Sequence, residues 1–229
     1  MLPWGHYALL ATYPVVMLSY AVHEHHRCVP VDDYTRDFVD VPRFVEFCRA
    51  CPQHDQTWAC PEFDFDPRDV WARYSWIHLI AFSMDFDPDQ RRTGWERDEL
   101  TREVMDTFHR EKKRALRTMI RLRNRVPGSQ VLGAGSCELR RVCTRQQGRP
   151  CRLPQLLVHS MESMGADVEA TSRELFDHPI EWSDGTSLPD SYVIVMGLVC
   201  NQPDLPPDAW GTPRHGVAAR PSARAVKAQ

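Results

Sequence analysis

Six of the eight cysteines in this chain fall into two groups of three, and no other feature constrains the fold as strongly. The groups are Cys48, Cys51 and Cys60, and Cys137, Cys143 and Cys151. The C-x2-C pair that opens the first group separates two thiols by one tight turn, so both can bind one metal centre without strain. Glycines and prolines near the second group supply the turns that such loops need. The grouping therefore favours metal ligation by all six side chains.

Two alternative roles for the cysteines stay open at this point. A redox dithiol of the thioredoxin type lies where a strand meets a helix in a βαβ unit. Here Cys48 and Cys51 instead follow a segment, Val41 to Phe47, that we predict to be helical. Thiols without a shared role are the second alternative, because the C-x5-C spacing of the second group is weak evidence for a metal when taken alone.

A disulfide framework is not needed, because a chain of 229 residues can bury a core of its own. Residues 1–22 contain no Asp, Glu, Lys or Arg, and many of them are apolar. No basic residue precedes this apolar run, however, Pro14 interrupts it, and no small-residue cleavage site follows it. It is also shorter and more polar than a membrane-spanning helix requires. We expect a cytoplasmic protein with reduced thiols and no membrane association, and this run is the one feature that argues for a signal or anchor.

The charged residues are nearly balanced. The chain has 28 Lys and Arg against 31 Asp and Glu, which gives a formal net charge of −3. Proteins that bind nucleic acid or anionic membranes concentrate positive charge. The sequence thus predicts binding neither to nucleic acid nor to a membrane. We expect instead a redox or protein partner, which the sequence does not identify.

Three apolar segments have the length and composition of buried strands. They are Trp76 to Phe82, Gln130 to Gly133 and Tyr192 to Val199. The turn-like residues Ser183-Asp184-Gly185 precede the last of them, so we expect it to form a hairpin with Pro179 to Trp182.

A long amphipathic helix is predicted from Glu96 to Arg125, because apolar residues recur there at helical spacing and Pro127-Gly128 follows. Thr171 and Glu174 have capping-box spacing, which predicts a short helix to about Phe176. Strands and helices with cysteine-bearing loops between them indicate an α+β fold with a small mixed sheet.

We divide the chain into three parts. Residues 1–40 form a poorly defined N-terminal extension, residues 41–200 a cysteine-rich metal-binding domain, and residues 201–229 a flexible tail rich in Pro, Ala and Arg. The tract from His23 to Cys28 has the composition of a small metal-binding segment, and we interpret it as solvated.

Two motifs give the chain a family resemblance. The first is Cys48-x2-Cys51-Pro52-x7-Cys60-Pro61, with Trp58 at an aromatic position, and it resembles a motif of a prokaryotic family of predicted metal-binding proteins, domain of unknown function 2284. The second and more specific motif of that family is similar to residues 135–168. Its matching residues are Gly135, Cys137, Cys143, Gly148, Pro150, Cys151, Arg152, Pro154, Ser160, Met161, Glu162, Gly165, Asp167 and Val168. The resemblance implies a set of cysteine ligands for an iron–sulfur centre, and it implies no particular reaction.

The chain departs from the family pattern at two positions. Arg140 stands where the family has its middle cysteine, and Glu62 replaces a proline. The second group therefore offers three thiolates to a site that would otherwise have four. A [4Fe–4S] centre with one open iron, a fourth ligand from elsewhere, or a degenerate site would each account for this. Candidates for a fourth ligand are His54, His159, Cys28 and Cys200.

We predict a metal-binding protein with an iron–sulfur centre of the [4Fe–4S] type that serves electron transfer or a redox accessory role. Its ligands are Cys137, Cys143 and Cys151, while Cys48, Cys51 and Cys60 complete the site or form a second one. Arg152 beside Cys151 would stabilise thiolate charge, and Glu162 would have a supporting or structural role.

Two alternatives to this function remain. One is a zinc-stabilised structural or regulatory module, in which Cys48, Cys51, His54 and Cys60 form a tetrahedral set. The other is an enzyme that uses an open iron site, and Arg140 is the residue that supports it.

Overall fold

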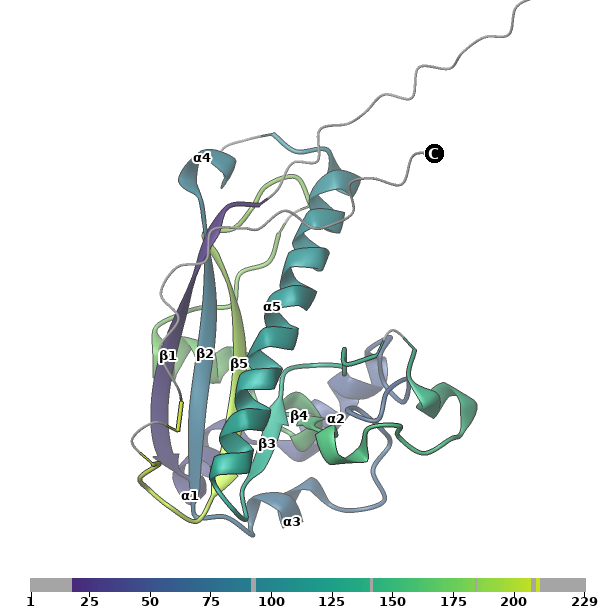
Figure 1. Ribbon diagram of the computed structural model, residues 1–229, viewed down its shortest axis with the longest axis vertical. Coiled ribbons are helices and arrows are strands. Elements are labelled where there is room, and N and C mark those ends of the chain that lie inside the picture. Colours follow the sequence, from purple (N-terminus) through teal and green to yellow (C-terminus); the bar gives the residue numbers. More distant parts are fainter. Residues whose placement is uncertain (1–17, 92–93, 141, 184, 207–208, 211–229) are drawn as a thin grey trace, which may run out of the picture.

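The computed structural model describes residues 18–91, 94–140, 142–183, 185–206 and 209–210, and its elements are labelled in Figure 1. The strands are β1 (Tyr20–Pro30), β2 (Trp76–Phe86), β3 (Gln130–Gly133), β4 (His159–Ser160) and β5 (Ser191–Cys200). The α-helices are α1 (Val31–Phe38), α2 (Val41–Ala50), α3 (Pro67–Trp71), α4 (Pro88–Arg91), α5 (Arg97–Arg125) and α6 (Val168–Phe176). Three 3-10 helices are η1 (Thr144–Gln147), η2 (Pro154–Leu156) and η3 (Glu162–Met164).

The five strands form one mixed sheet in the order β1-β2-β5-β3-β4. Neighbouring strands are antiparallel except for β3 and β4, which are parallel. The interior strand β2 is buried on both faces, and its residues Leu79, Ile80 and Ala81 are fully buried. A strand covered on both sides reads as a continuous apolar run, which is why it was predictable from the sequence. The predicted α+β class with a small mixed sheet is confirmed.

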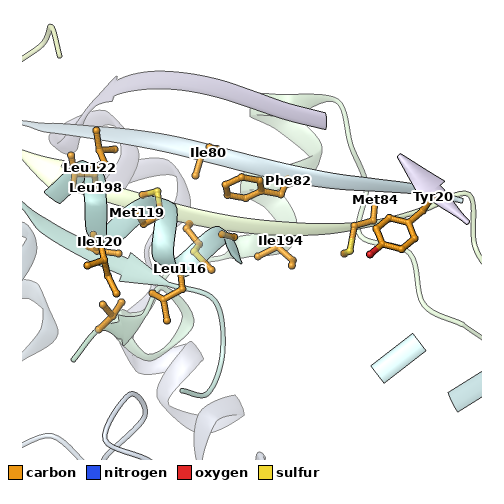
Figure 2. Packing of buried hydrophobic residues seen from close by; sticks show 14 of the residues in the cluster. Tyr20, Ile80, Phe82, Met84, Leu116, Met119, Ile120, Leu122, Ile194 and Leu198 are labelled. Atoms are coloured by element: carbon orange, nitrogen blue, oxygen red, sulfur yellow. The ribbon is translucent and has the colours of Figure 1, made fainter. Parts of the chain in front are cut away.

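Helix α5 packs along one face of this sheet (Figure 1). Figure 2 shows Leu116, Met119 and Leu122 of α5 facing residues of β2 and β5 such as Ile80 and Leu198. These helical residues recur at the spacing that places apolar side chains on one stripe of a helix. Acidic residues in the first turn of α5 and arginines in its last turn oppose the partial charges of the helix ends and stabilise it.

The other face of the sheet is covered by α1, α3, α6 and η3. Two buried hydrogen bonds tie these elements together. The Tyr34 hydroxyl lies 2.9 Å from Thr171 Oγ1, and the Trp71 indole N–H donates to the carbonyl oxygen of Met164 at 2.9 Å. The sheet therefore has a hydrophobic cluster on each side, as expected for layered packing.

The predicted strands and the long helix are present, and two of the strands extend further than predicted. Two other predictions need correction. Helix α6 begins at Val168 and not at Thr171, because Asp167 caps it by accepting a hydrogen bond from the Ala170 N–H at 2.8 Å. The hairpin before β5 is wrong: residues 179–182 form no strand, and β5 pairs instead with β2 and β3, which occupy both of its edges.

The N-terminal segment contributes to the fold from Leu18 onward. Strand β1 pairs with β2 over its whole length, and α1 packs on the sheet. The tract from His23 to Cys28 is part of β1 and is not a separate solvated segment. Its His25 ring lies 4.5 Å from the ring of His178. Residues 1–17 and most of the predicted tail, 211–229, lie outside the described residues.

Candidate metal centre

Figure 1 shows α2 and the loop that follows β3 gathered on one side of the sheet, near β3 and β4. We call α2 together with residues 51–66 and 134–158 the cysteine lobe. All six grouped cysteines belong to it, whereas Cys28 lies on β1 and Cys200 on β5. All eight thiols are free.

The first cysteine group is built on the end of α2 and a tightly turned loop. Helix α2 extends beyond the predicted Phe47 to Ala50, so Cys48 lies in its last turn and Cys51 caps it. The Cys51 N–H donates to the Cys48 carbonyl oxygen at 3.0 Å, and the Asp55 N–H donates to the Cys60 carbonyl oxygen at 2.9 Å. Asp55 has a left-handed backbone (φ 57°), which lets the loop reverse. These turns bring the ends of the loop back together.

Two thiols of the first group, those of Cys48 and Cys60, contact η3 and β4. Burial, together with the smaller effects of nearby Cys60, Glu162 and Cys51, raises the pKa of Cys48 to about 11. Burial likewise raises the pKa of Cys60 to about 11. The Cys48 thiol contacts the Glu162 carbonyl oxygen at 3.7 Å, and the Cys60 thiol contacts Ser160 Oγ at 3.6 Å. Without a metal both side chains are therefore neutral thiols, and binding as thiolates would release their protons.

The second group lines a single pocket. Cys137, Cys143 and Cys151 border it together with Trp58, Leu139, Arg140, Val142, Thr144, Arg152, Leu153, Leu156 and Leu157. Burial raises the pKa of Cys137, and the neighbouring Cys143 and Cys151 raise it as well. The Leu153 N–H donates to Cys151 Sγ at 3.4 Å. Three half-buried thiols thus border one apolar cavity that has two arginines at its edge.

Three contacts fasten the two cysteine loops to each other. The Trp58 indole N–H donates to the Arg149 carbonyl oxygen at 3.1 Å. The Arg145 guanidinium lies over the Trp58 ring, 4.5 Å from its centre, and forms an ion pair with Asp55. The loops that carry the two groups are therefore parts of one structure, although about 90 residues separate them in the sequence.

Glu162 links the two groups from within the second family motif. Its backbone carbonyl oxygen accepts a hydrogen bond from the Cys48 thiol. Its carboxylate accepts a hydrogen bond at 3.2 Å from the N–H of Gly135, two residues before Cys137. Gly135 has a left-handed backbone (φ 50°), a conformation that favours glycine. The structure thus gives Glu162 a supporting role between the loops.

Lys112 joins the long helix to the lobe. Its side chain is 7% exposed, and its ammonium forms an ion pair with Glu138 at 2.8 Å. Its positive charge acts on both Cys60 and Cys137 and partly offsets the rise in their pKa values that burial causes. We did not predict this residue. The available signal was a lysine on the apolar stripe of α5, one turn before Leu116.

No group of three or more His, Cys, Asp or Glu side chains among the described residues is gathered closely enough to enclose one metal ion. A single zinc ion draws four ligands to within about 2.0–2.3 Å of its centre. A [4Fe–4S] cluster spaces its ligands further apart, because each cysteine binds a different iron. Thiolates are the ligands that iron–sulfur clusters and zinc both select, so the donor set of the lobe suits either group.

The profile of a family described as predicted metal-binding protein (DUF2284) matches residues 34–200. The chain belongs to this family. The match includes both cysteine groups and confirms the resemblance that the two motifs indicated. No curated protein and no solved structure matches the chain. Within the part of the chain that the structure describes, no helix is both long enough and apolar enough to span a membrane.

The residues that distinguish this chain from the DUF2284 pattern lie at the edges of the lobe. Arg140 is exposed and borders the pocket of the second group. Glu62 pairs with Arg49 at 2.8 Å and lies 3.4 Å from His54 Nε2. Arg140 thus places a permanent positive charge at the pocket, at the position where the resemblance leads us to expect a cysteine.

The four candidates for an additional ligand have other contacts. His54 faces Glu62, and the ring of His159 packs edge-on against Phe63 at 5.0 Å. Burial lowers the pKa of His159. The Cys28 thiol lies 3.8 Å from His78 Nε2, and the Cys200 thiol contacts the Gln202 carbonyl oxygen at 3.3 Å. Among the described residues that border the pocket of the second group, none is one of these four.

Proposed function

We propose that this protein binds an iron–sulfur cluster of the [4Fe–4S] type and uses it for electron transfer or as a redox accessory protein. The ligands are Cys137, Cys143 and Cys151, and Cys48, Cys51 and Cys60 complete the same centre or hold a second one. Membership of a predicted metal-binding family supports the metal. Free thiols of this kind persist in the reducing cytoplasm, where we place the protein.

The observation that carries the proposal is the shared pocket of the second group. Three thiols from one loop border it, while Trp58 and mainly apolar side chains, with Thr144 and two arginines, form the rest of its wall. Soft thiolates held in a largely apolar shell are the usual surroundings of an iron–sulfur cluster, since the shell limits water and adjusts the potential. When bound, the cluster would supply one-electron redox chemistry.

The positive charges around the lobe support a cluster of negative charge. Lys112 lies between the two groups, and Arg140 and Arg152 border the pocket. Anionic thiolates and bridging sulfides are stabilised by nearby cations. These residues would favour the reduced, more negative state and raise the reduction potential.

A zinc-stabilised module is the second candidate. The sequence spacing of Cys48, Cys51 and Cys60 favours it for the first group, because zinc accepts three thiolates with one further ligand. Such a site would supply folding free energy to the lobe.

Metal analysis of the full chain after anaerobic purification tests the proposal. We expect iron and acid-labile sulfide in equal amounts, with broad visible absorption. Cys151→Ser should lose iron and sulfide, whereas the control Cys28→Ser, a thiol outside the lobe, should keep them. Zinc without iron would contradict the proposal, and equal iron in both variants would remove Cys151 from the ligand set.

A further inference from the structure

Positive charge is concentrated in the loop that carries the second cysteine group. Residues 134–157 contain five arginines and a single acidic residue, Glu138, so this segment has a net charge of +4. The whole chain has a net charge of −3, and the remainder therefore carries −7. A charge asymmetry of this size directs long-range encounter toward one face of a protein.

Three of these arginines are available to a partner. Arg145 is held by Asp55 and Trp58 within the lobe. Arg140, Arg149 and Arg152 are exposed, and none of them has an ion-pair partner among the described residues. Arg140 and Arg152 border the cysteine pocket itself. The free positive charge of the lobe is thus placed around the proposed cluster.

An apolar side chain lies among these arginines. Val142 is 57% exposed and borders the same pocket, between Arg140 and Cys143. Protein–protein interfaces combine a buried apolar centre with a polar rim, and arginine is enriched in them while lysine is depleted. The basic residues of this loop are all arginines. Their type and arrangement therefore favour a protein partner.

We propose that the arginine face, defined as Arg140, Val142, Arg149 and Arg152, docks a small acidic electron-carrier protein that exchanges electrons with the cluster. This inference rests on the proposed function. One electron passes from the reduced carrier to the oxidised cluster, so the carrier is oxidised by the one electron that the cluster gains. No bond or proton has to move, and the docked carrier lies over the pocket wall, which keeps the transfer distance short.

Nucleic acid is the other negatively charged partner that could bind the arginine face, and the charge distribution of the chain disfavours it. A nucleic acid extends well beyond one loop, and the negative remainder of this chain would repel it. A compact acidic protein meets only the arginine face. Its association should be fast at low salt and should slow as salt screens the charges, over a length of about 10 Å at 0.1 M.

Charge reversal on matched faces tests the docking. The test variant is R140E/R149E/R152E, and the control is R102E/R117E/R121E on the exposed side of α5, which changes the net charge equally. The probe is a purified, reduced flavodoxin of strongly negative net charge, mixed with the iron-loaded full chain under anaerobic conditions. The rate of cluster reduction is measured across a salt series.

We expect the test variant to slow electron transfer about tenfold or more at low salt and to lose the salt dependence, while the control stays near the wild-type rate. R149E alone keeps both pocket-lining arginines and should give a smaller loss in the same direction, even if the triple variant binds less iron. Equal rates in the test and control variants would overturn the proposal. Tight binding of a single-stranded oligonucleotide that R149E abolishes would also overturn it, in favour of nucleic acid.

The two proposals fail in different ways. A chain that contains no iron ends the proposed function, and docking is then judged by calorimetric titration of the same variants with oxidised flavodoxin. A chain that contains iron but shows no difference between the two sets of variants keeps the cluster and loses the docking face.

Discussion

The sheet and the cysteine lobe of this protein are held together in different ways. In the sheet, residues such as Leu79 and Ile80 on β2 and Met119 on α5 are completely buried, and the strands pair along their whole length. In the lobe, five of the six cysteines retain solvent exposure, and the loops are joined by a few hydrogen bonds and ion pairs of Trp58, Arg145 and Glu162.

This difference shows where metal would matter. Burial of apolar surface contributes about 25 cal/mol for each Å² removed from water, so the sheet and its helices can fold without any ligand. The lobe buries little by comparison, and exposed ion pairs contribute only about 0–1 kcal/mol each. A metal centre that binds thiolates from several turns supplies the missing free energy. The sheet is thus the scaffold, and under the proposed function the lobe is the part that a metal centre would stabilise.

The largest expected effect lies at the junction of the two regions. Lys112→Met removes the buried ammonium that pairs α5 with Glu138 and leaves that carboxylate to His109, whose Nε2 lies 3.6 Å away. Breaking a buried ion pair on one side costs about 3–5 kcal/mol. We expect urea denaturation to show a loss of this size in the free energy of unfolding. Arg117→Met, which removes an exposed charge from the same helix, should cost less than about 0.5 kcal/mol. Equal losses for the two variants would show that the ion pair between Lys112 and Glu138 adds no more to the free energy of unfolding than an exposed charge does.

A smaller effect, confined to the lobe, is expected at Trp58. Trp58→Phe removes the hydrogen bond to the Arg149 carbonyl and weakens the contact with Arg145. The expected cost is about 1 kcal/mol, so amide hydrogen exchange in residues 51–60 and 144–152 should become about fivefold faster while β2 stays protected. The control is Trp182→Phe, at a tryptophan that is 81% exposed. Faster exchange in β2 would mean that lobe and sheet unfold as one unit.

The smallest perturbation is chemical and leaves the fold intact. In metal-free protein, iodoacetamide should modify the exposed Cys51 before the buried Cys60, whose pKa is raised by burial to about 11. Thiolate is the reactive form, so raising the solution from about pH 7 to about pH 9 should speed Cys60 about a hundredfold. Peptide mass spectrometry follows each site. Metal loading should protect the lobe cysteines and leave the exposed Cys28 reactive, and protection of Cys28 as well would argue against the lobe as the metal site.

Much of the scaffold was predictable because buried strands and helices have characteristic apolar patterns in the local sequence. The apolar run of β2 and the helical stripe of α5 each identify one element. Strand β1 was missed because its histidines, Glu24 and Arg27 obscure the alternation of an edge strand. The false hairpin came from a real turn, in which the Gly185 N–H donates to Ser183 Oγ. Glu181 contacts the start of β5 through its carboxylate, which accepts from the N–H groups of Asp190 and Ser191.

The cysteine groups of the candidate site could be recognised in the sequence, since the members of each lie within one short segment. The residues that join the groups could not, because they come from elements far apart in sequence. Lys112 and Glu138 are separated by 26 residues, and Asp55 and Arg145 by 90. Such pairs leave no local pattern, and Lys112 could have been noticed only as a charge on an otherwise apolar stripe.

The position of β1 has a practical consequence for any attempt to isolate this domain. The family match begins at residue 34, after the end of β1 at Pro30. A fragment cut at that boundary would lack the strand that pairs with β2 along eleven residues. It would turn an interior strand into an open, apolar edge, which is a template for aggregation. A soluble fragment should therefore start before Tyr20, well upstream of where the family resemblance begins.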